Sequence, residues 1–274
     1  MPKFEILCVT MHQTDFAKVA EMNIHSNVVF ANQCDRTAYE EKSFDGFTAK
    51  MISTETRGVG INRNLALTYA SADICLLADD DVVYADDMEA RVLAEFDAHP
   101  DADVMIFHLA STDPRRPQIS YPKTKKHGRF GRMPWGGVRI AFRLSALRRA
   151  NVWFTTLFGG GCLYPSGEDS MFLTDLKRAG LRFYVSRETI GTAKMEESAW
   201  FTGYDEKFYF GKGAFVAARH PKTFFFWCRY YLFRYRKHKE LSWQQKKKWM
   251  NHGRRAYQKM YSFCDIQRPS PKSI

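Results

Sequence analysis

Three consecutive aspartates, Asp79, Asp80 and Asp81, follow the apolar run ICLLA at residues 74–78. A short apolar run of this kind is typical of a strand buried in a sheet. Adjacent carboxylates repel one another, so a site that keeps all three ionised needs a compensating cation. The alternative is a polar loop between a strand and a helix, because aspartate is common in turns and at helix starts.

A second acidic pair, Glu168 and Asp169, stands in the stretch SGEDSMF at residues 166–172. A helix is predicted from about Glu168, so one interpretation is structural. Ser166 would then cap the helix, and the acids would be stabilised by the helix dipole. A carboxylate there could also act as a general base toward a hydroxyl nucleophile. The two interpretations are compatible.

Short β-prone runs alternate with helical stretches over the first 110 residues. The predicted strands are 5–10, 27–33, 49–54, 73–78 and 103–110, and the predicted helices are 15–25, 59–72 and 86–99. Such alternation predicts a mostly parallel sheet with helices on both faces. Ligands bind at the carboxyl ends of the strands in these sheets. Thr10, Asp35 and the three aspartates all fall at such ends, which favours a functional site over a loop.

The order of these pieces resembles the family 2 glycosyltransferases with the GT-A fold, over roughly residues 3–215. The matching segments are EILCVT, RGVGINRNLAL, LLADDD, WGGVRIAF and GEDSMFLTDLKRAGLRFYVS. Each segment alone is a weak indication of the family. The resemblance rests on the order of the segments, which is the same as in the family. It implies an α/β GT-A domain and an inverting, metal-dependent transfer of a sugar from a nucleotide sugar, expected to be a UDP-sugar. The implied acceptor is a glycan or a lipid-linked acceptor in surface polysaccharide synthesis.

The resemblance also implies roles for the two acidic groups. In the family an Asp-x-Asp motif and a divalent cation meet the donor diphosphate, so Asp81 and Asp79 are expected to bind Mn2+ or Mg2+. Asp79 and Asp80 are also expected to contact the nucleotide. The family's Glu-Asp pair makes Asp169 the expected catalytic base, with Glu168 supporting it or holding the acceptor.

Other residues match positions that hold the donor in the family. Contacts to the nucleotide or the sugar are expected from Thr10, Asp35, Arg57, Arg63, Trp135, Gly136 and Gly137. For Arg63 the alternative is a charge on a helix surface, and for Trp135 it is a side chain of the core. The stretch between Ser111 and Pro134, rich in Pro, Gly and basic residues, is predicted to be a lid.

The net charge of +11 is concentrated near the C-terminus. Residues 219–259 hold 13 Lys and Arg against one acid, with aromatic residues interleaved at helical spacing. We therefore predict a glycosyltransferase domain at 1–218 and a basic, aromatic-rich helical extension at 219–274, with helices near 221–239 and 242–261. The helices could pack on the domain, bind an anionic membrane surface or bind nucleic acid. The resemblance favours the membrane, because many acceptors of the family are lipid-linked, and no nucleic acid is expected.

The remaining features concern the compartment. The six cysteines are far apart and form no C-x-x-C pair, so neither a zinc site nor a redox motif is expected, and a reducing cytosol fits best. The first residues lack the features of a signal peptide, and no run of 18 apolar residues predicts a spanning helix. The expected location is cytoplasmic, peripheral on the inner face of the cell membrane.

Two other classes of protein are alternatives to a glycosyltransferase. A non-catalytic basic module that binds nucleic acid or anionic lipid would not require the acidic groups at 79–81 and 168–169. A sugar-phosphate nucleotidyltransferase usually carries a Gly-rich basic loop after its first strand, and TMHQTDF at residues 10–16 lacks one. The glycosyltransferase is therefore the preferred interpretation.

Overall fold

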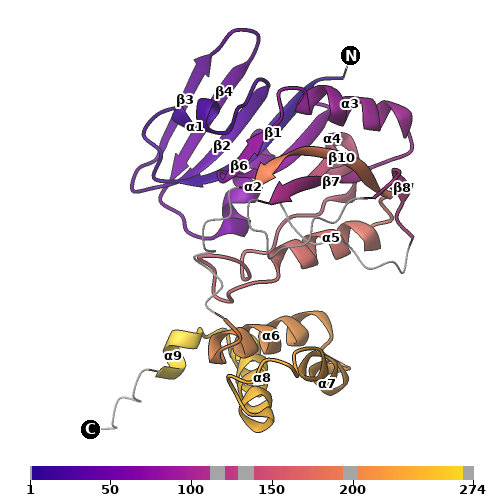
Figure 1. Ribbon diagram of the computed structural model, residues 1–274. Coiled ribbons are helices and arrows are strands. Elements are labelled where there is room, and N and C mark those ends of the chain that lie inside the picture. Colours follow the sequence, from indigo (N-terminus) through magenta and orange to yellow (C-terminus); the bar gives the residue numbers. More distant parts are fainter. Residues whose placement is uncertain (1, 112–120, 129–138, 194–202, 268–274) are drawn as a thin grey trace. The chain divides into compact units, whose positions relative to one another are not determined.

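The computed structural model describes residues 2–111, 121–128, 139–193 and 203–267 (Figure 1). These residues form two compact units, which are described separately. The sheet unit contains the described residues of 1–57, 61–154 and 169–196, and the helical unit contains those of 58–60, 155–168 and 197–274.

The sheet unit is built on a mixed sheet whose strands lie in the order β3-β4-β2-β1-β5-β9-β7-β10-β6, with β8 paired to β10. The strands are β1 (Phe4–Met11), β2 (Asn27–Gln33), β3 (Ala38–Ser43), β4 (Thr48–Thr54), β5 (Ile74–Asp79), β6 (Val82–Tyr84), β7 (Val104–Ser111), β8 (Lys125–Lys126), β9 (Ile140–Arg143) and β10 (Phe183–Ala193). The neighbours β4, β2, β1 and β5 are all parallel, whereas β9 is antiparallel to both β5 and β7. The predicted α/β class with a mostly parallel sheet is confirmed.

Helices cover both faces of this sheet. They are α1 (Ala17–Glu21), α2 (Val59–Tyr69), α3 (Met88–Ala98), α4 (Leu144–Ala150) and α5 (Glu168–Arg178). Residues of α1 and α3 share one hydrophobic core with Phe4 and Ile6 of β1, while residues of α2, α4 and α5 share another with Leu7. Alternate residues of a strand point to opposite faces, so β1 contributes to both cores. Helices α3 and α5 accordingly lie on opposite sides of the sheet (Figure 1).

The central strands were predicted because they are buried on both faces and therefore read as continuous apolar runs. Strand β3, which pairs with β4 at one edge of the sheet, was not predicted. Its sequence AYEEKS is mostly exposed and polar, so no hydrophobic pattern marks it. Helix α5 begins at Glu168, so Gly167 precedes it directly and the predicted cap Ser166 lies one residue further back.

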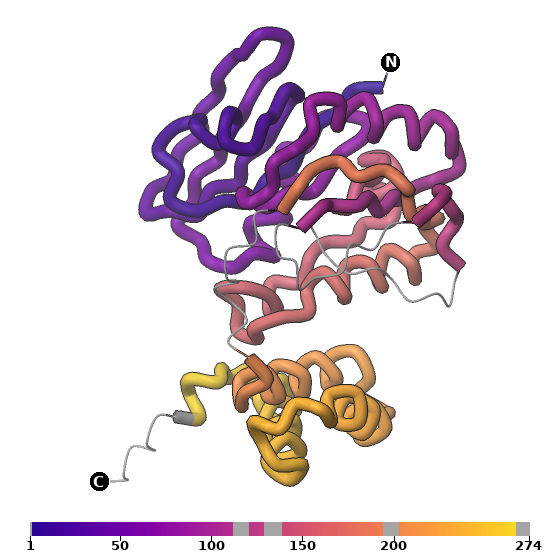
Figure 2. The backbone as a smooth tube through the Cα atoms, in the orientation of Figure 1, coloured from indigo at the N-terminus to yellow at the C-terminus, as the bar shows by residue number. Residues whose placement is uncertain are grey.

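The helical unit contains four helices that follow one another along the chain, as the trace in Figure 2 shows for the described residues. They are α6 (Glu206–Arg219), α7 (Phe224–Arg234), α8 (Trp243–Lys259) and α9 (Phe263–Gln267). Asp205 caps the start of α6, and its side chain accepts a hydrogen bond from the Phe208 backbone N–H at 2.8 Å. Helix α8 begins with a capping box formed by Ser242 and Gln245. Such caps satisfy backbone donors that have no partner inside the helix.

Two glycines bring α6 and α8 into backbone contact. A Cβ added to Gly213 would lie 2.0 Å from the Met250 carbonyl oxygen, and one added to Gly253 would lie 2.0 Å from that of Phe210. No side chain larger than hydrogen fits at either position. The helices therefore cross at these glycines, and the crossing fixes where α8 packs.

The helices α7 and α8 fall inside the two segments where helices were predicted, 221–239 and 242–261. Helix α6 was not predicted, and it ends one residue beyond the predicted domain limit at residue 218. Within the structure α6 belongs to the same compact unit as α7 and α8. The division into domains at 218/219 stays a prediction.

Candidate active site

The three aspartates lie at the carboxyl end of β5 and in the turn that follows it. Asp79 is the last residue of β5 and is paired in register with Val9 of the parallel neighbour β1. Thr10, next along β1, donates a hydrogen bond from Oγ1 to Oδ2 of Asp80 at 2.5 Å. The structure thus brings Thr10 and the aspartates together at adjacent strand ends.

Arg63 of α2 connects this acidic cluster to the start of α5. Its Nη2 lies 3.1 Å from Oδ1 of Asp79, and its Nη1 forms an ion pair with Oδ1 of Asp169. The guanidinium also lies 5.2 Å from the centre of the Phe154 ring. Arg63 is only 4% exposed, so the alternative that it is a helix-surface charge is wrong. Its predicted contact with the nucleotide stays a prediction.

The carboxyl groups of the cluster differ in how their surroundings affect them. Burial raises the pKa of Asp79, and the neighbouring Arg63 guanidinium opposes that rise. Burial, together with the charges of Asp79 and Asp80, raises the pKa of Asp81 to about 6. A site of this kind favours any ligand that brings positive charge.

The cluster fits a cation that is shared with a substrate. Among the described residues no three His, Cys, Asp or Glu side chains form a ligand set by themselves. Mg2+ commonly binds through one or two carboxylates together with substrate phosphates, so a full protein ligand set is not required. Asp81 in the turn and the strand-end Asp79 supply oxygen ligands of the right kind.

Asp169 and Glu168 form the first turn of α5. The Asp169 side chain is 24% exposed and is held by Arg63. Glu168 accepts a hydrogen bond from the backbone N–H of Gly167 at 3.0 Å, and within the helical unit its charge acts on Lys212. Burial lowers the pKa of that lysine, and the charge of Glu168 opposes the shift.

Asp35 and Arg57 are not joined to the acidic cluster by any contact that the structure describes. Asp35 follows β2 and is exposed. The Arg57 guanidinium donates to the backbone carbonyls of Cys34, Glu55 and Thr56, at 2.8, 3.0 and 3.2 Å. Arg57 therefore holds the loop between β4 and α2, and its predicted donor contact stays a prediction.

Several predictions fall outside the described residues. Trp135, Gly136 and Gly137 lie within 129–138, and most of the predicted lid at 111–134 falls within 112–120 and 129–134. Their predicted contacts with the donor remain predictions.

Two asparagines that position the site were not recognised from the sequence. Asn62 is fully buried, and its Nδ2 donates to the carbonyls of Ala31 at 2.6 Å and Thr10 at 3.4 Å. Asn64 exchanges hydrogen bonds with the backbone of Phe154, at 2.8 and 2.9 Å, and so fixes the ring that Arg63 covers. The available signal was the pair of asparagines that flanks Arg63 on α2.

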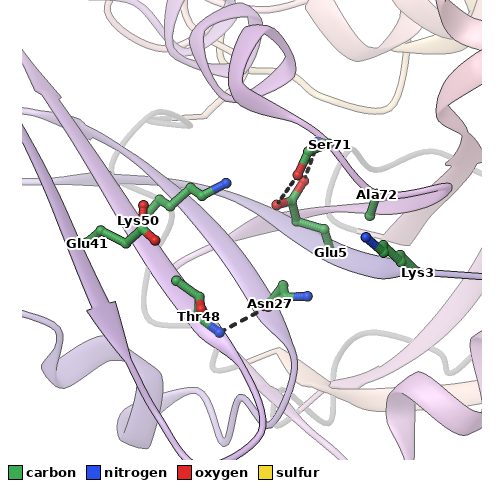
Figure 3. A pocket seen from close by; sticks show the side chains of 8 residues that line it. All are labelled: Lys3, Glu5, Asn27, Glu41, Thr48, Lys50, Ser71 and Ala72. Atoms are coloured by element: carbon green, nitrogen blue, oxygen red, sulfur yellow. Dashed lines mark hydrogen bonds between the residues drawn. The ribbon is translucent and has the colours of Figure 1, made fainter.

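A separate hollow of about 220 Å³ lies at the opposite ends of the parallel strands (Figure 3). Figure 3 shows Glu5 at its wall, bonded to Ser71, and Asn27 bonded to Thr48. These residues stand at the amino ends of β1, β2 and β4 and before β5. Ligands of parallel sheets bind at the carboxyl ends, so this hollow is not part of the candidate site.

Comparisons with known proteins bear on the family and the fold. Residues 25–153 match the model of glycosyl transferase family 2. Among solved structures, S. aureus TarS 1-349 in complex with UDP-GlcNAc gives a TM-score of 0.59 at 17% sequence identity, covering 93% of this chain and 73% of that chain. TarS 1-349 alone gives 0.56 at 16% identity, covering 98% and 75%. The longer TarS structure gives 0.56 at 17% identity, covering 96% and 44%. No protein of curated function matches the chain by sequence.

The fold is the GT-A architecture of these solved structures, and the family match places the chain in the class of glycosyltransferases. The match to the model of glycosyl transferase family 2 spans residues 25–153, a little under half of the chain, and indicates a glycosyltransferase. The predicted enzyme class is thereby confirmed.

Proposed function

We propose that this glycosyltransferase moves a sugar from a UDP-sugar to a glycan or lipid-linked acceptor in surface polysaccharide synthesis, with inversion at the anomeric carbon. The observation that carries the proposal is the Arg63 guanidinium, which binds Asp79 and Asp169 at once. Asp79 lies at the strand end, where the donor of such a fold would bind. Asp169 is the carboxylate proposed as the base. The Arg63 side chain lies between the two and contacts both.

On the donor side, Asp81 and Asp79 would hold Mn2+ or Mg2+. Such an ion neutralises the charge that develops on the leaving diphosphate. Asp80, oriented by Thr10, and the exposed Asp35 would contact the nucleotide. Arg57 would support them by holding the adjoining loop.

On the acceptor side, Asp169 would take the proton from the acceptor hydroxyl as its oxygen attacks the anomeric carbon. The bond to the diphosphate breaks as the new bond forms, and its electron pair leaves with the diphosphate. One displacement inverts the configuration at that carbon. Glu168 would help to hold the acceptor.

We also propose that the enzyme works on the inner face of the cell membrane as a peripheral protein. Within the described part of the chain, no helix combines the length and the apolar character that crossing a bilayer demands. The bases concentrated at 219–259 support attraction to anionic lipid. We expect no nucleic acid partner.

The test is a thermal-shift panel of nucleotides and nucleotide sugars, with and without Mn2+, on the protein and its Asp81→Asn variant. Ligands that bind only the folded state raise the unfolding temperature. We expect UDP and a UDP-sugar to raise the unfolding temperature of the protein more with Mn2+ than without it. The variant should lose this additional rise. Without ligand, the unfolding temperatures of the variant and the parent should agree to within a few degrees. An increment of equal size in the variant would refute the role of Asp81.

A further inference from the structure

Helix α7 carries aromatic side chains on its outer face that the proposed chemistry does not use. Phe225, Phe226 and Phe233 are 63%, 69% and 62% exposed, and Tyr230 is also exposed. Together with the exposed Arg229, these residues are called the outer face of α7 here. Exposing three phenylalanines to water on one helix is unfavourable in an isolated protein. We therefore expect this face to bind a partner.

The opposite face of α7 shows that the outward placement is fixed. Phe224, Cys228 and Leu232, spaced four residues apart, are buried in the hydrophobic core that also includes Met250 of α8. Residues at this spacing lie on one side of a helix. Rotating α7 to bury the exposed phenylalanines would expose this set, so the outer face stays outward.

Basic side chains border these rings. Arg229 lies on the face itself, and Arg236 and Lys237 follow it and are exposed. The Arg236 guanidinium stands 4.2 Å from the centre of the Phe233 ring, and that of Arg254 stands 5.2 Å from the Phe225 ring. Glu240 is the one acid in the sequence between residues 219 and 259. The surface is therefore apolar at its centre and positively charged at its border.

We propose that the outer face of α7 docks on an anionic lipid bilayer. The phenyl rings enter the level between head groups and acyl chains, while the bordering bases bind lipid phosphates. The proposal rests on the membrane location put forward above and names the surface responsible for it. It does not depend on the transfer chemistry.

Charge and shape select the bilayer over two other occupants. A second copy of the chain would bring like charges together at the border, which disfavours self-association through this face. Single-stranded nucleic acid is usually held in a groove whose aromatic residues stack on successive bases, whereas these rings stand on the outward face of one helix. An anionic bilayer matches both the apolar centre and the basic border.

The experiment is flotation of the full chain with vesicles of phosphatidylcholine alone or mixed with phosphatidylserine, at low and at high salt. We expect binding to the anionic vesicles that high salt weakens, and little binding to the neutral ones. Replacing Phe225, Phe226 and Phe233 together by Ser should lower the partition coefficient at least tenfold, since each ring loses its apolar burial. Replacing Arg229, Arg236 and Lys237 together by Gln should lower it about 100-fold at low salt.

Matched controls change the same chemistry elsewhere. Tyr39→Ser removes an aromatic side chain that is 52% exposed on β3. Lys42→Gln, Lys123→Gln and Arg178→Gln together remove three exposed bases of the sheet unit. Both controls should float like the parent protein. Thermal unfolding of every variant checks that the fold is kept, and because the changed side chains are exposed, we expect shifts of no more than a few degrees.

A second measurement tests the proposal even if the triple Ser variant fails to fold. Phe226→Trp should place an indole at the same position, and brominated lipids should quench its fluorescence more than that of the parent's own tryptophans. The proposal is overturned if the parent does not float with anionic vesicles at low salt, or if the Ser variant floats equally well. It is also overturned if the parent is a dimer and the Ser variant is a monomer. A further contrary result would be a single-stranded RNA that displaces the parent from vesicles and whose binding is lost in the Ser variant. Transfer to a soluble glycan acceptor, measured separately, reports on the proposed enzymatic function alone.

Discussion

Arg63 is almost wholly buried, and a buried positive charge is tolerated only where opposite charges and hydrogen bonds compensate it. Asp79 and Asp169 provide that compensation, and the Phe154 ring covers the guanidinium. Arginine suits this position because its planar fork can bind two carboxylates in fixed directions, whereas an ammonium group cannot. Side chains 106 residues apart in sequence are held together in this way.

We predict that Arg63→Lys lowers kcat about 100-fold, because a base misplaced by about 1 Å loses this much. The affinity for UDP in the presence of Mn2+ should change far less. Steady-state kinetics and calorimetric titration with UDP measure the two effects separately. Arg36→Lys, which alters an exposed ion pair with Glu40, is the matched control. A variant with the parent's kcat would show that Arg63 does not position the base.

We predict that Asp169→Asn keeps donor binding and lowers transfer by about two to four orders of magnitude, the usual contribution of a general base. The change keeps the size of the side chain and removes its capacity to accept a proton. Asp175→Asn, on the same helix and with a partly exposed side chain, should retain activity. Equal losses of UDP binding and of transfer in Asp169→Asn would point to a structural role.

At the scale of the elements, the crossing of α6 and α8 has no room for a methyl group at its glycines. Gly253→Ala would place a Cβ 2.0 Å from the Phe210 carbonyl oxygen and 2.7 Å from the Ala214 nitrogen. We predict a loss of stability of about 3 kcal/mol or more, since overpacking of this kind displaces backbone. Urea unfolding measures it, with Gln258→Ala on the exposed side of α8 as the control. An unchanged midpoint would contradict the close crossing.

An ion pair at the start of β7 and β10 should make stability depend on pH. Burial would raise the pKa of Asp103, but hydrogen bonds from the backbone and side chain of Arg182 outweigh burial and lower it. A carboxyl whose pKa is lowered by folding stabilises the fold above its unfolded pKa of about 3.9, and this contribution disappears as the pH falls below that value.

Asp103→Asn should therefore cost about 1–3 kcal/mol at neutral pH, as expected for buried hydrogen bonds to a charged group, and much less near pH 3. Urea unfolding of both proteins at the two pH values tests this. Asp101→Asn, which alters a surface pair with Lys126, should have a smaller effect at neutral pH. A cost for Asp103→Asn that is equal at both pH values would refute the ionic contribution.

The elements show why part of the fold could be predicted from the sequence. Strands β1, β2, β4, β5 and β7 are central and buried. Their sequences are therefore apolar runs, from which the strands could be predicted. Helix α6 was missed because Gly211 and Gly213 are poor helix formers, and only the contact with α8 explains the second of them. The formation of α6 thus depends on tertiary packing, which the local sequence does not show.

The same limit applies to the candidate site. Residue type and position indicated Asp79, Asp81 and Asp169, because carboxylates at strand ends and helix starts are visible in the sequence. The pairing of Arg63 with two of them, and the support from Asn62, depend on contacts between distant segments. No local pattern could have revealed these contacts.

At the scale of the whole molecule, the helical unit depends on its last helices. Tyr209 and Val216 of α6 are buried in the core that contains Phe224, Leu232 and Met250. A chain truncated after Ala218 would keep all of α6 except Arg219 and lose the side chains that cover it. We predict that this truncated protein aggregates, as judged by size-exclusion chromatography and by binding of a hydrophobic dye.

A chain that ends at Gln267 is the control, because it removes only residues 268–274 and keeps α6 to α9. It should elute like the full protein. A monomeric, non-aggregating protein after truncation at Ala218 would show that α6 does not need this core and would favour the domain limit predicted from the sequence.

The edge strand β3 has a consequence for how the protein behaves when many copies are crowded together. A strand at the edge of a sheet offers backbone groups to which the strand of another molecule can add. In β3 the side chains of Glu40, Glu41 and Lys42 place charges of both signs along that edge. An incoming strand of a neighbouring molecule would have to desolvate these charges. The polar sequence that hid β3 from prediction thus disfavours the addition of a further strand at this edge.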